Sequence, residues 1–377
     1  MRAEVVSRGQ APVRPLARTP EPRLLDLAID TVRGESATVA ETLRATHTDA
    51  FVVLHEGRLV CESYAAGRAA DEPHLLHSIT KSFVGCLAGI LAAEDTLDVE
   101  APAAAYVPEL AGGGYAPATV RDLLDMRTGG DYVERHDLPD TELAAMAEIA
   151  GWRPRTRPDL PDSVRTYAAH TDRQARHAGP FSYRSLDTEV LAWVLERAGG
   201  APVRDLLESL LLGRLGTEAD GTVVTDPAGD PVASGGLSLV PRDLARFGQM
   251  LLDGGSVGST QVVPTLFLRD TRQGGPDSVA AFGSRVGERL GPDAPYSTSG
   301  MYRNQFWVPV QGARQILCLG VHGQALLVDA DNDVVALKLS SWPLAQDVGL
   351  FTDGLTCLTA VSSQLGGRPH DRRTLLR

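Results

Sequence analysis

The sequence predicts an α/β fold in which an antiparallel sheet flanked by helices carries an inserted, mostly helical domain. Runs with the alternating period of strands lie near both ends of the chain, whereas the middle shows the spacing of helices. With 377 residues the chain is also long for one hydrophobic core, so two lobes are expected. We predict a loose N-terminal arm over residues 1–22, an α/β domain over 23–100 and 240–377, a mostly helical domain over 101–239, and an active site in the cleft between the two domains.

The segment up to residue 100 predicts a helix, a β-hairpin and a second helix. Spaced apolar residues over 24–32 favour a packing helix. Two strand-like runs, 50–54 and 58–64, are joined by a His-Glu-Gly turn, which is typical of a β-hairpin. From Ile79 to Leu91 apolar residues recur at helical spacing, so a buried helix is expected there.

The middle of the chain alternates helical and irregular segments. Residues 119–126 predict a short helix with Thr119 as its N-cap and Asp122 at the third helical position. Residues 127–180 are irregular and rich in Arg, Asp, Pro and His, which leaves room for a mobile loop over a cleft. Further helices are predicted over 186–198, 204–212 and, with Pro241 in the first turn, 241–252.

The C-terminal part of the chain returns to the strand period. Residues 315–321, 324–329 and 333–339 are short β-rich runs, and an Ala-Asp-Asn turn joins the last two. We expect them to form an antiparallel meander that is closed by a helix over 347–363. The helical domain is therefore predicted to be an insertion between the two parts of an α/β domain.

The composition excludes several classes of protein. Hydrophobic residues make up 43% and charged residues 22%, which is typical of a globular chain, and no run reaches the roughly 18 apolar residues of a membrane helix. A net charge of −12 disfavours nucleic-acid and anionic-membrane partners. The four cysteines are far apart, and no apolar run of signal-peptide length begins the chain, so a cytoplasmic location with free thiols is expected. His74 and His77 lack a clustered third ligand, so we expect no metal and no cofactor.

Ser78-x-x-Lys81, at the start of the helix expected from Ile79, is the strongest chemical motif. Residues three apart on a helix face the same way, so the two side chains are expected side by side. A serine hydroxyl becomes a good nucleophile only when a base takes its proton, and a desolvated lysine amine can be that base. Only Lys81 and Lys338 are lysines among 36 basic residues, and arginine cannot serve as a base.

Two further positions fit an acyl-transfer site. Tyr183 stands just before a predicted helix and is a candidate proton shuttle, with a phenolate that a cationic neighbour would favour. Taken alone, such a tyrosine is more often a half-buried packing residue. Gly323 interrupts the meander, which suggests close approach of a ligand, and the backbone N–H groups of Gln324 and Ser78 would then form an oxyanion hole. Taken alone, Gly323 is equally well explained as an ordinary glycine of a β-hairpin.

Together these motifs resemble those of the penicillin-recognising serine hydrolases, which include class C β-lactamases, D-alanyl-D-alanine carboxypeptidases and family VIII esterases. The motifs that carry the resemblance, in order and spacing, are Ser78-x-x-Lys81, Tyr183-x-Ser185 and Val321-His322-Gly323. The likeness covers most of residues 48–342 and implies a β-lactamase/transpeptidase-like fold. The 6-aminohexanoate-dimer (nylon oligomer) hydrolases look most similar, on the segments LLDMRTG (123–129), YRNQFW (302–307) and GVHGQ (320–324).

The resemblance implies that Ser78 is the nucleophile, Lys81 its base and Tyr183 the proton shuttle. Which of Lys81 and Tyr183 first takes the serine proton is left open. The candidate substrate contacts are Ser185, His322, Gly323 and Tyr132. Tyr132 lies among the acidic residues of the irregular segment (Asp131, Glu134 and Asp137), which are read either as solvated loop charges or as a trap for a substrate ammonium group.

Two departures from the β-lactamase pattern predict a different substrate. Ser185 replaces the asparagine of the tyrosine motif, and Val321-His322-Gly323 replaces Lys-Thr-Gly, so a side-chain amide and a cation are both lost. Lys338 lies on a later strand and is no obvious substitute. We expect β-lactamase activity to be weak at most, and a neutral or differently charged acyl group to be the substrate.

The sequence thus predicts a serine hydrolase that cleaves a linear amide or small ester through a Ser78 acyl-enzyme. One alternative is an acyltransferase or peptidase of a biosynthetic pathway that uses the same acyl-enzyme, and another is a non-catalytic binding homologue. The expected partner is a small molecule, and a homodimer is left open. Gly254-x-Ser256-x-Gly258 matches a nucleophile elbow in letters only, because a predicted helix rather than a strand precedes it, and we interpret it as a loop.

Overall fold

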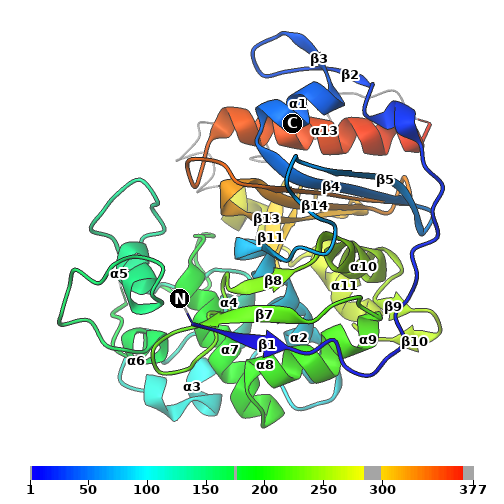
Figure 1. Cartoon of the computed structure of the whole chain (residues 1–377). Coiled ribbons are helices and arrows are strands. Elements are labelled where there is room, and N and C mark those ends of the chain that lie inside the picture. Colours follow the sequence, from blue (N-terminus) through cyan, green and yellow to red (C-terminus); the bar gives the residue numbers. More distant parts are fainter. Residues whose placement is uncertain (1, 174–175, 284–298, 368–377) are drawn as a thin grey trace.

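The computed structural model describes residues 2–173, 176–283 and 299–367, and it has an upper α/β lobe above a mostly helical lobe (Figure 1). The upper lobe is built on an antiparallel sheet, as predicted, and this sheet has seven strands among the described residues. Its strands, in spatial order, are β11 (Met301–Arg303), β12 (Phe306–Val308), β13 (Gln315–Gly320), β14 (Gln324–Asp329), β15 (Val334–Ser340), β4 (Thr48–His55) and β5 (Arg58–Tyr64).

Strand alternation divides the core of this lobe between the two faces of the sheet. Along β4, Phe51 and Val53 pack with helices α1 (Val39–Ala45) and α13 (Val348–Leu365). Val52 and Leu54 belong to the second and larger core, on the side of helix α10 (Pro241–Leu252). Successive side chains of a strand point to opposite faces, so an uninterrupted apolar run is what a sheet covered on both faces requires.

Helix α2 (Thr80–Ala93) is shared by the two lobes. Phe83 stacks on Phe247 of α10, with ring centroids 3.8 Å apart, while the helix also packs against α7 (Ser185–Gly199) of the lower lobe. Its apolar residues at helical spacing are fully buried, which explains why the nucleophile motif leads into the centre of the molecule.

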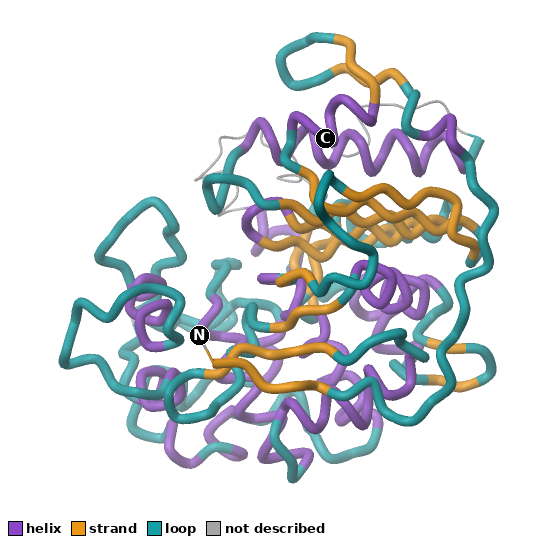
Figure 2. Tube along the Cα trace, in the orientation of Figure 1, coloured by secondary structure: helices purple, strands orange, loops and turns teal. Residues whose placement is uncertain are grey.

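The lower lobe combines short helices with a small sheet (Figure 2). The helices are α3 (Ala103–Tyr106), α4 (Val120–Leu124), α5 (Glu142–Ile149), α6 (Val164–Ala169), α7, α8 (Val203–Leu206) with the π-helical turn Leu207–Leu212, and α9 (Gly213–Leu215). The four-stranded sheet has the order β1 (Arg2–Val6), β7 (Gly221–Thr225), β8 (Leu237–Leu239) and β6 (His74–Leu75). The predicted capping box at Thr119 and Asp122 is present on α4.

The remaining elements of the described chain are turns, two hairpins and one helix. They are the 3₁₀ turns Pro22–Leu24, His77–Ile79, Pro108–Leu110 and Val321–Gly323, the hairpins β2 (Ala28–Asp30) with β3 (Ser36–Thr38) and β9 (Ser256–Val257) with β10 (Thr260–Gln261), and helix α11 (Thr265–Gln273). Among the described residues, no helix is long and apolar enough to cross a membrane.

Three local predictions were wrong. Residues 1–22 are not simply a loose arm, because Arg2–Val6 pairs in full register with β7, a partner that lies far along the chain. Residues 24–32 form no helix: the apolar side chains of Leu24 and Ile29 are buried by a 3₁₀ turn and a β2–β3 hairpin instead. The segment 127–180 contains α5 and α6, whose N-caps, Thr141 and Ser163, are local signals that its many prolines and charges obscured.

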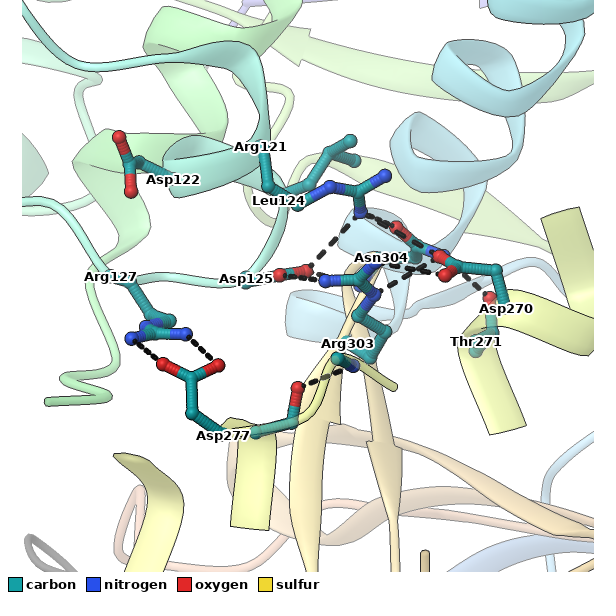
Figure 3. A network of polar contacts seen from close by, with 12 residues as sticks. Arg121, Asp122, Leu124, Asp125, Arg127, Asp270, Thr271, Asp277, Arg303 and Asn304 are labelled. Atoms are coloured by element: carbon teal, nitrogen blue, oxygen red, sulfur yellow. Dashed lines mark hydrogen bonds and ion pairs between the residues drawn. The ribbon is translucent and has the colours of Figure 1, made fainter. Parts of the chain in front are cut away.

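The turn between β11 and β12 joins the sheet to the helical lobe (Figure 3). Arg303 donates to Asp125 at 2.6 Å and to both oxygens of Asp270 at 2.8 and 3.0 Å. Asn304 adds side-chain bonds to Asp270 and Thr271 at 2.9 Å. Asn304 has a left-handed φ of 54°, which lets the turn fold tightly enough to reach α4 and α11.

The close approach of this turn to α2 can be tested at Gly85. A Cβ added there would overlap the carbonyl oxygen of Asn304. We expect Gly85→Ala to destabilise the protein by about 1–3 kcal/mol, since overpacking against fixed backbone outweighs the roughly 1 kcal/mol gain in helix propensity. Gly112→Ala, at a site with open space, is the matched control. Equal midpoints of urea unfolding for the two variants would contradict a close contact between Gly85 and the carbonyl oxygen of Asn304.

Candidate active site

Ser78 lies in the His77–Ile79 turn that leads into α2. The turn is held by the backbone N–H of Leu76, which donates to Leu237 of β8 at 2.9 Å. On its other side it meets the end of β13, where a Cβ on Gly320 would lie 2.7 Å from the carbonyl oxygen of Leu76. Glycine is therefore required at 320 so that the sheet edge can pass next to the nucleophile turn.

Lys81 is 1% exposed, and its amine is surrounded by three oxygen atoms. In its charged form Nζ donates to Ser78 Oγ at 3.0 Å, to Ser185 Oγ at 3.1 Å and to the carbonyl oxygen of Ser234 at 2.6 Å. Burial lowers the pKa of Lys81 to about 8, against the opposing effect of nearby carboxylates. A neutral amine has two N–H groups, so bonds to Ser185 and Ser234 leave its lone pair directed at Ser78.

Tyr183 joins this group from the segment before α7. Lys81 Nζ lies 5.1 Å from the centre of its ring, and the side chain of Ser78 lies close enough to oppose the rise in its pKa. Trp307 stacks on the ring at 5.4 Å and Tyr302 contacts it edge-on at 5.9 Å. Burial raises the pKa of Tyr183, so the phenolate that a cationic neighbour was expected to favour does not form near neutral pH.

Ser185 is held inside the protein by Glu134. The hydroxyl of Ser185 donates to one carboxylate oxygen of Glu134 at 2.8 Å, and its backbone N–H donates to the other at 2.9 Å. Glu134 is only 8% exposed. Its interpretation as a solvated loop charge or a substrate trap was wrong, because the side chain turns inward to the start of α7.

Tyr132, which was predicted to touch the substrate, is directed into the helical lobe. The residue is 4% exposed, and its hydroxyl points at Met146 Sδ, 3.6 Å away, within the core of the helical lobe. Both Tyr132 and Glu134 face inward from the same irregular segment, but only Glu134 is hydrogen-bonded to Ser185. The sequence could not distinguish them, because both are polar residues in an irregular stretch.

Glu189 is a further site residue that sequence reasoning missed. Its carboxylate accepts the backbone N–H groups of Ala233 and Ser234 at 3.1 and 2.8 Å, which fixes the carbonyl of Ser234 that binds Lys81. Burial raises the pKa of Glu189, while those hydrogen bonds oppose the rise. A signal was present in the sequence: Glu189 follows Ser185 by one helical turn, so both project from the same face of α7.

The residues from the GVHGQ segment line the hairpin between β13 and β14. His322 lies beside the nucleophile turn, with its ring 5.3 Å from that of His77, and its Nδ1 is 2.8 Å from the carbonyl oxygen of Trp342. Gly323 has a φ of +88°, and a Cβ there would overlap the indole of Trp342, so packing and backbone geometry account for the glycine.

Gln324 pairs with Gly320 across this hairpin and is 1% exposed. Its side-chain amide donates to the carbonyl of Ser340 at 2.7 Å and accepts the N–H of the same residue. The side chain therefore holds the hairpin, and only the main chain is left to face the site. An oxyanion hole formed by the backbone N–H groups of Ser78 and Gln324 stays a prediction.

Other candidates lie apart from this cluster. Ser256 is in the β9–β10 hairpin and bonds to Gln261. Lys338 is buried on β15, where its amine donates to Thr46 and Ser340 over the ring of Trp342. Within the part of the chain that the structure describes, no group of three or more His, Cys, Asp or Glu side chains could hold a metal ion.

The geometry of this site agrees with a family assignment. The protein family described as β-lactamase matches residues 37–349. The chain belongs to the β-lactamase family. It is therefore a hydrolase of the β-lactamase and penicillin-binding superfamily, and the resemblance inferred from the motifs is confirmed, as is the fold class.

Similar proteins of this family include nylon-oligomer hydrolases. A 6-aminohexanoate-dimer hydrolase of Paenarthrobacter ureafaciens is 36% identical over 315 residues, which cover 84% of this chain and 78% of the relative. A Bacillus anthracis structure described as a candidate 6-aminohexanoate-dimer hydrolase superposes with a TM-score of 0.87 at 27% identity, covering 98% of this chain and 92% of the other. A family VIII carboxylesterase, with a TM-score of 0.58 at 15% identity over 85% of this chain and 96% of its own, shares the fold alone.

The lowered pKa of Lys81 predicts a pH dependence for any reaction in which the amine is the base. Only the neutral form accepts a proton, so kcat/KM is expected to rise with pH and to level off above about 8. At lower pH it should fall about tenfold per pH unit. Hydrolysis of p-nitrophenyl butyrate across this range measures the acid limb. A rate that stays constant below the pKa of Lys81 would contradict the assignment.

Proposed function

We propose that this protein is a serine hydrolase that cleaves a linear amide or a small ester through an acyl-enzyme on Ser78. The observation that carries the proposal is the 3.0 Å hydrogen bond between Lys81 Nζ and Ser78 Oγ, made by an amine that burial has partly deprotonated. A serine with a desolvated base at this distance is an activated nucleophile. An inert binding homologue would have no need to bury a lysine there.

In the proposed reaction Ser78 Oγ attacks the acyl carbon while its proton passes to Lys81 Nζ. The C–N or C–O bond then breaks, and the leaving atom takes a proton from the hydroxyl of Tyr183. Lys81 returns the serine proton to Tyr183, so that the enzyme is neutral again as the acyl-enzyme. Water attacks the ester by the same route in reverse, with its proton taken up by this pair, and releases the acid and free Ser78.

The directions of the two pKa shifts favour Lys81 as the first base. Burial lowers the pKa of the amine and raises that of the Tyr183 hydroxyl, so near neutral pH the amine can accept a proton and the phenol can donate one. Lys81 is thereby suited to act as the base toward Ser78, and Tyr183 is suited to act as the acid toward the leaving group.

The substrate class follows from the relatives and from the departures in the motifs. The Paenarthrobacter relative is a hydrolase of the 6-aminohexanoate dimer, a linear amide. Val321-His322-Gly323 lacks the lysine that pairs with a β-lactam carboxylate. The amine of Lys338 is hydrogen-bonded to Thr46 and Ser340, on the side of the sheet that α13 covers. We therefore propose a linear amide or small ester rather than a β-lactam. The four cysteines are buried and free, which fits a reaction in the cytoplasm.

A fluorophosphonate probe followed by intact-mass analysis tests the nucleophile. Wild-type protein should gain one adduct, and Ser78→Ala should gain none, whereas Ser256→Ala, as the control, should label like wild type. The relative rates on 6-aminohexanoate dimer and p-nitrophenyl butyrate then distinguish an amidase from an esterase. A wild-type protein that stays unlabelled would contradict the proposed function and favour a binding homologue.

Lys81→Arg tests the base. The guanidinium keeps the positive charge but cannot accept a proton, so we expect labelling and hydrolysis to fall by about a thousandfold or more. Circular dichroism and a urea titration check that the variant is folded. Near-normal turnover in a folded variant would remove Lys81 from its proposed role.

The alternative of an acyltransferase is tested by adding amines to the wild-type reaction. Transfer of the acyl group to the amine in place of water would indicate an acyltransferase.

A further inference from the structure

We propose that Glu134 is a positioning residue for the reaction at Ser78, because its carboxylate orients the Ser185 hydroxyl and thereby aims the lone pair of Lys81 at the nucleophile. The inference rests on the proposed function and extends it to a residue outside the three catalytic groups. The path is continuous and buried: Glu134 Oε1 to Ser185 Oγ is 2.8 Å, Ser185 Oγ to Lys81 Nζ is 3.1 Å, and Lys81 Nζ to Ser78 Oγ is 3.0 Å.

The direction of each hydrogen bond follows from the number of protons available. An ionised carboxylate only accepts, whereas a serine hydroxyl has one proton to donate. Because that proton of Ser185 goes to Glu134, the oxygen of Ser185 must accept from Lys81. One N–H of the amine is then committed to Ser185 and a second to the carbonyl of Ser234. The remaining tetrahedral position, the lone pair of the neutral amine, faces Ser78.

Without the Glu134 carboxylate, nothing fixes which way the hydrogen bond between Ser185 and Lys81 runs. The Ser185 hydroxyl could turn and donate to the amine, which would draw the lone pair of Lys81 away from Ser78. The second carboxylate oxygen strengthens the constraint, since it accepts the backbone N–H of Ser185 at 2.9 Å and so fixes Glu134 at the start of the 15-residue helix α7. A negative charge at a helix N-terminus is also favoured by the helix dipole.

Other titratable groups around Glu134 and Lys81 must be considered in any pH experiment. His136 Nε2 lies 3.9 Å from Glu134, but burial lowers the pKa of this histidine, which leaves it neutral near pH 7. The Glu134 carboxylate favours the charged form of Lys81, so its removal lowers the pKa of the amine. The other titratable groups that interact electrostatically with Glu134 or Lys81 are Tyr132, His136, Tyr183, Glu189 and His77.

Glu134→Gln is the primary test, with Asp140→Asn, which removes an exposed carboxylate from the same segment, as the matched control. We expect the rate of fluorophosphonate labelling above pH 8 to fall about ten- to a hundredfold in Glu134→Gln and to stay unchanged in Asp140→Asn. The acid limb of the rate should move to lower pH, because the amine loses a stabilising negative charge. A variant that merely loosens the loop and admits water would move the limb to higher pH.

A double-mutant cycle with Ser185→Ala identifies the route of the effect. If Glu134 acts through the hydroxyl, Glu134→Gln costs little further labelling rate once that hydroxyl is absent. The proposal would be overturned if the rate losses of Glu134→Gln and Ser185→Ala multiplied in the double variant. It would also be overturned if the acid limb of Glu134→Gln stayed at the wild-type pH or moved to higher pH, or if Asp140→Asn lost as much labelling rate. Should Glu134→Gln not fold, Ser185→Ala must lose labelling rate while Ser185→Thr, which keeps the hydroxyl, retains most of it.

The wild-type control separates this inference from the proposed function. If wild-type protein does not label at all, the serine hydrolase assignment fails. If wild-type protein labels on Ser78 and Glu134→Gln labels at the same rate with the same pH profile, the hydrolase assignment stands and the positioning role of Glu134 is wrong.

Discussion

The site depends on the burial of one amine. Lys81 is surrounded by protein because α2 places its apolar residues, including Phe83 and Leu87, in the core between the lobes. Removing a lysine from water disfavours its charge and would be costly without partners. The three oxygen atoms around Nζ supply those partners, and the same desolvation brings the pKa of Lys81 to about 8. The packing that stabilises the fold therefore also lowers the pKa of the amine that we propose as the base.

The partners of Lys81 come from segments that are far apart in sequence, so their positions depend on how the lobes are joined. Gln305 provides much of this joint. Its carbonyl oxygen accepts the Ser82 hydroxyl of α2 at 2.9 Å, and its side chain accepts from Thr188 of α7 at 2.8 Å and donates to the carbonyl of Leu123 in α4 at 2.9 Å. One turn residue thus binds three helices, and Trp307 on the strand that follows supports the ring of Tyr183.

The departures from the β-lactamase pattern acquire a physical meaning in this arrangement. A serine at 185 is short enough to lie between Lys81 and Glu134, so its hydroxyl is used inside the protein, where the resemblance suggested a substrate contact. Likewise the segment Val321-His322-Gly323 is shaped by its contacts with Trp342. Both changes remove polar groups that would face a β-lactam, and they leave the proposed catalytic residues Ser78, Lys81 and Tyr183 in place.

Local sequence patterns were sufficient for elements whose apolar period and caps are self-contained. The β4–β5 hairpin, the C-terminal meander, the capped helix α4 and the Ser78–Lys81 pair were all predictable, because neighbours along the chain determine them. The strand β1 was not, since its partner β7 is supplied by residues distant in sequence. Three side-chain positions were not predictable either: the inward turn of Glu134, the support of Ser234 by Glu189 and the burial of Tyr132. The direction of such a side chain is determined by the segments that pack against it, which are distant in sequence. The sequence by itself determined which groups are candidates for the chemistry. The tertiary structure decided their pKa shifts and directions, because desolvation and hydrogen-bond geometry arise only when distant segments meet.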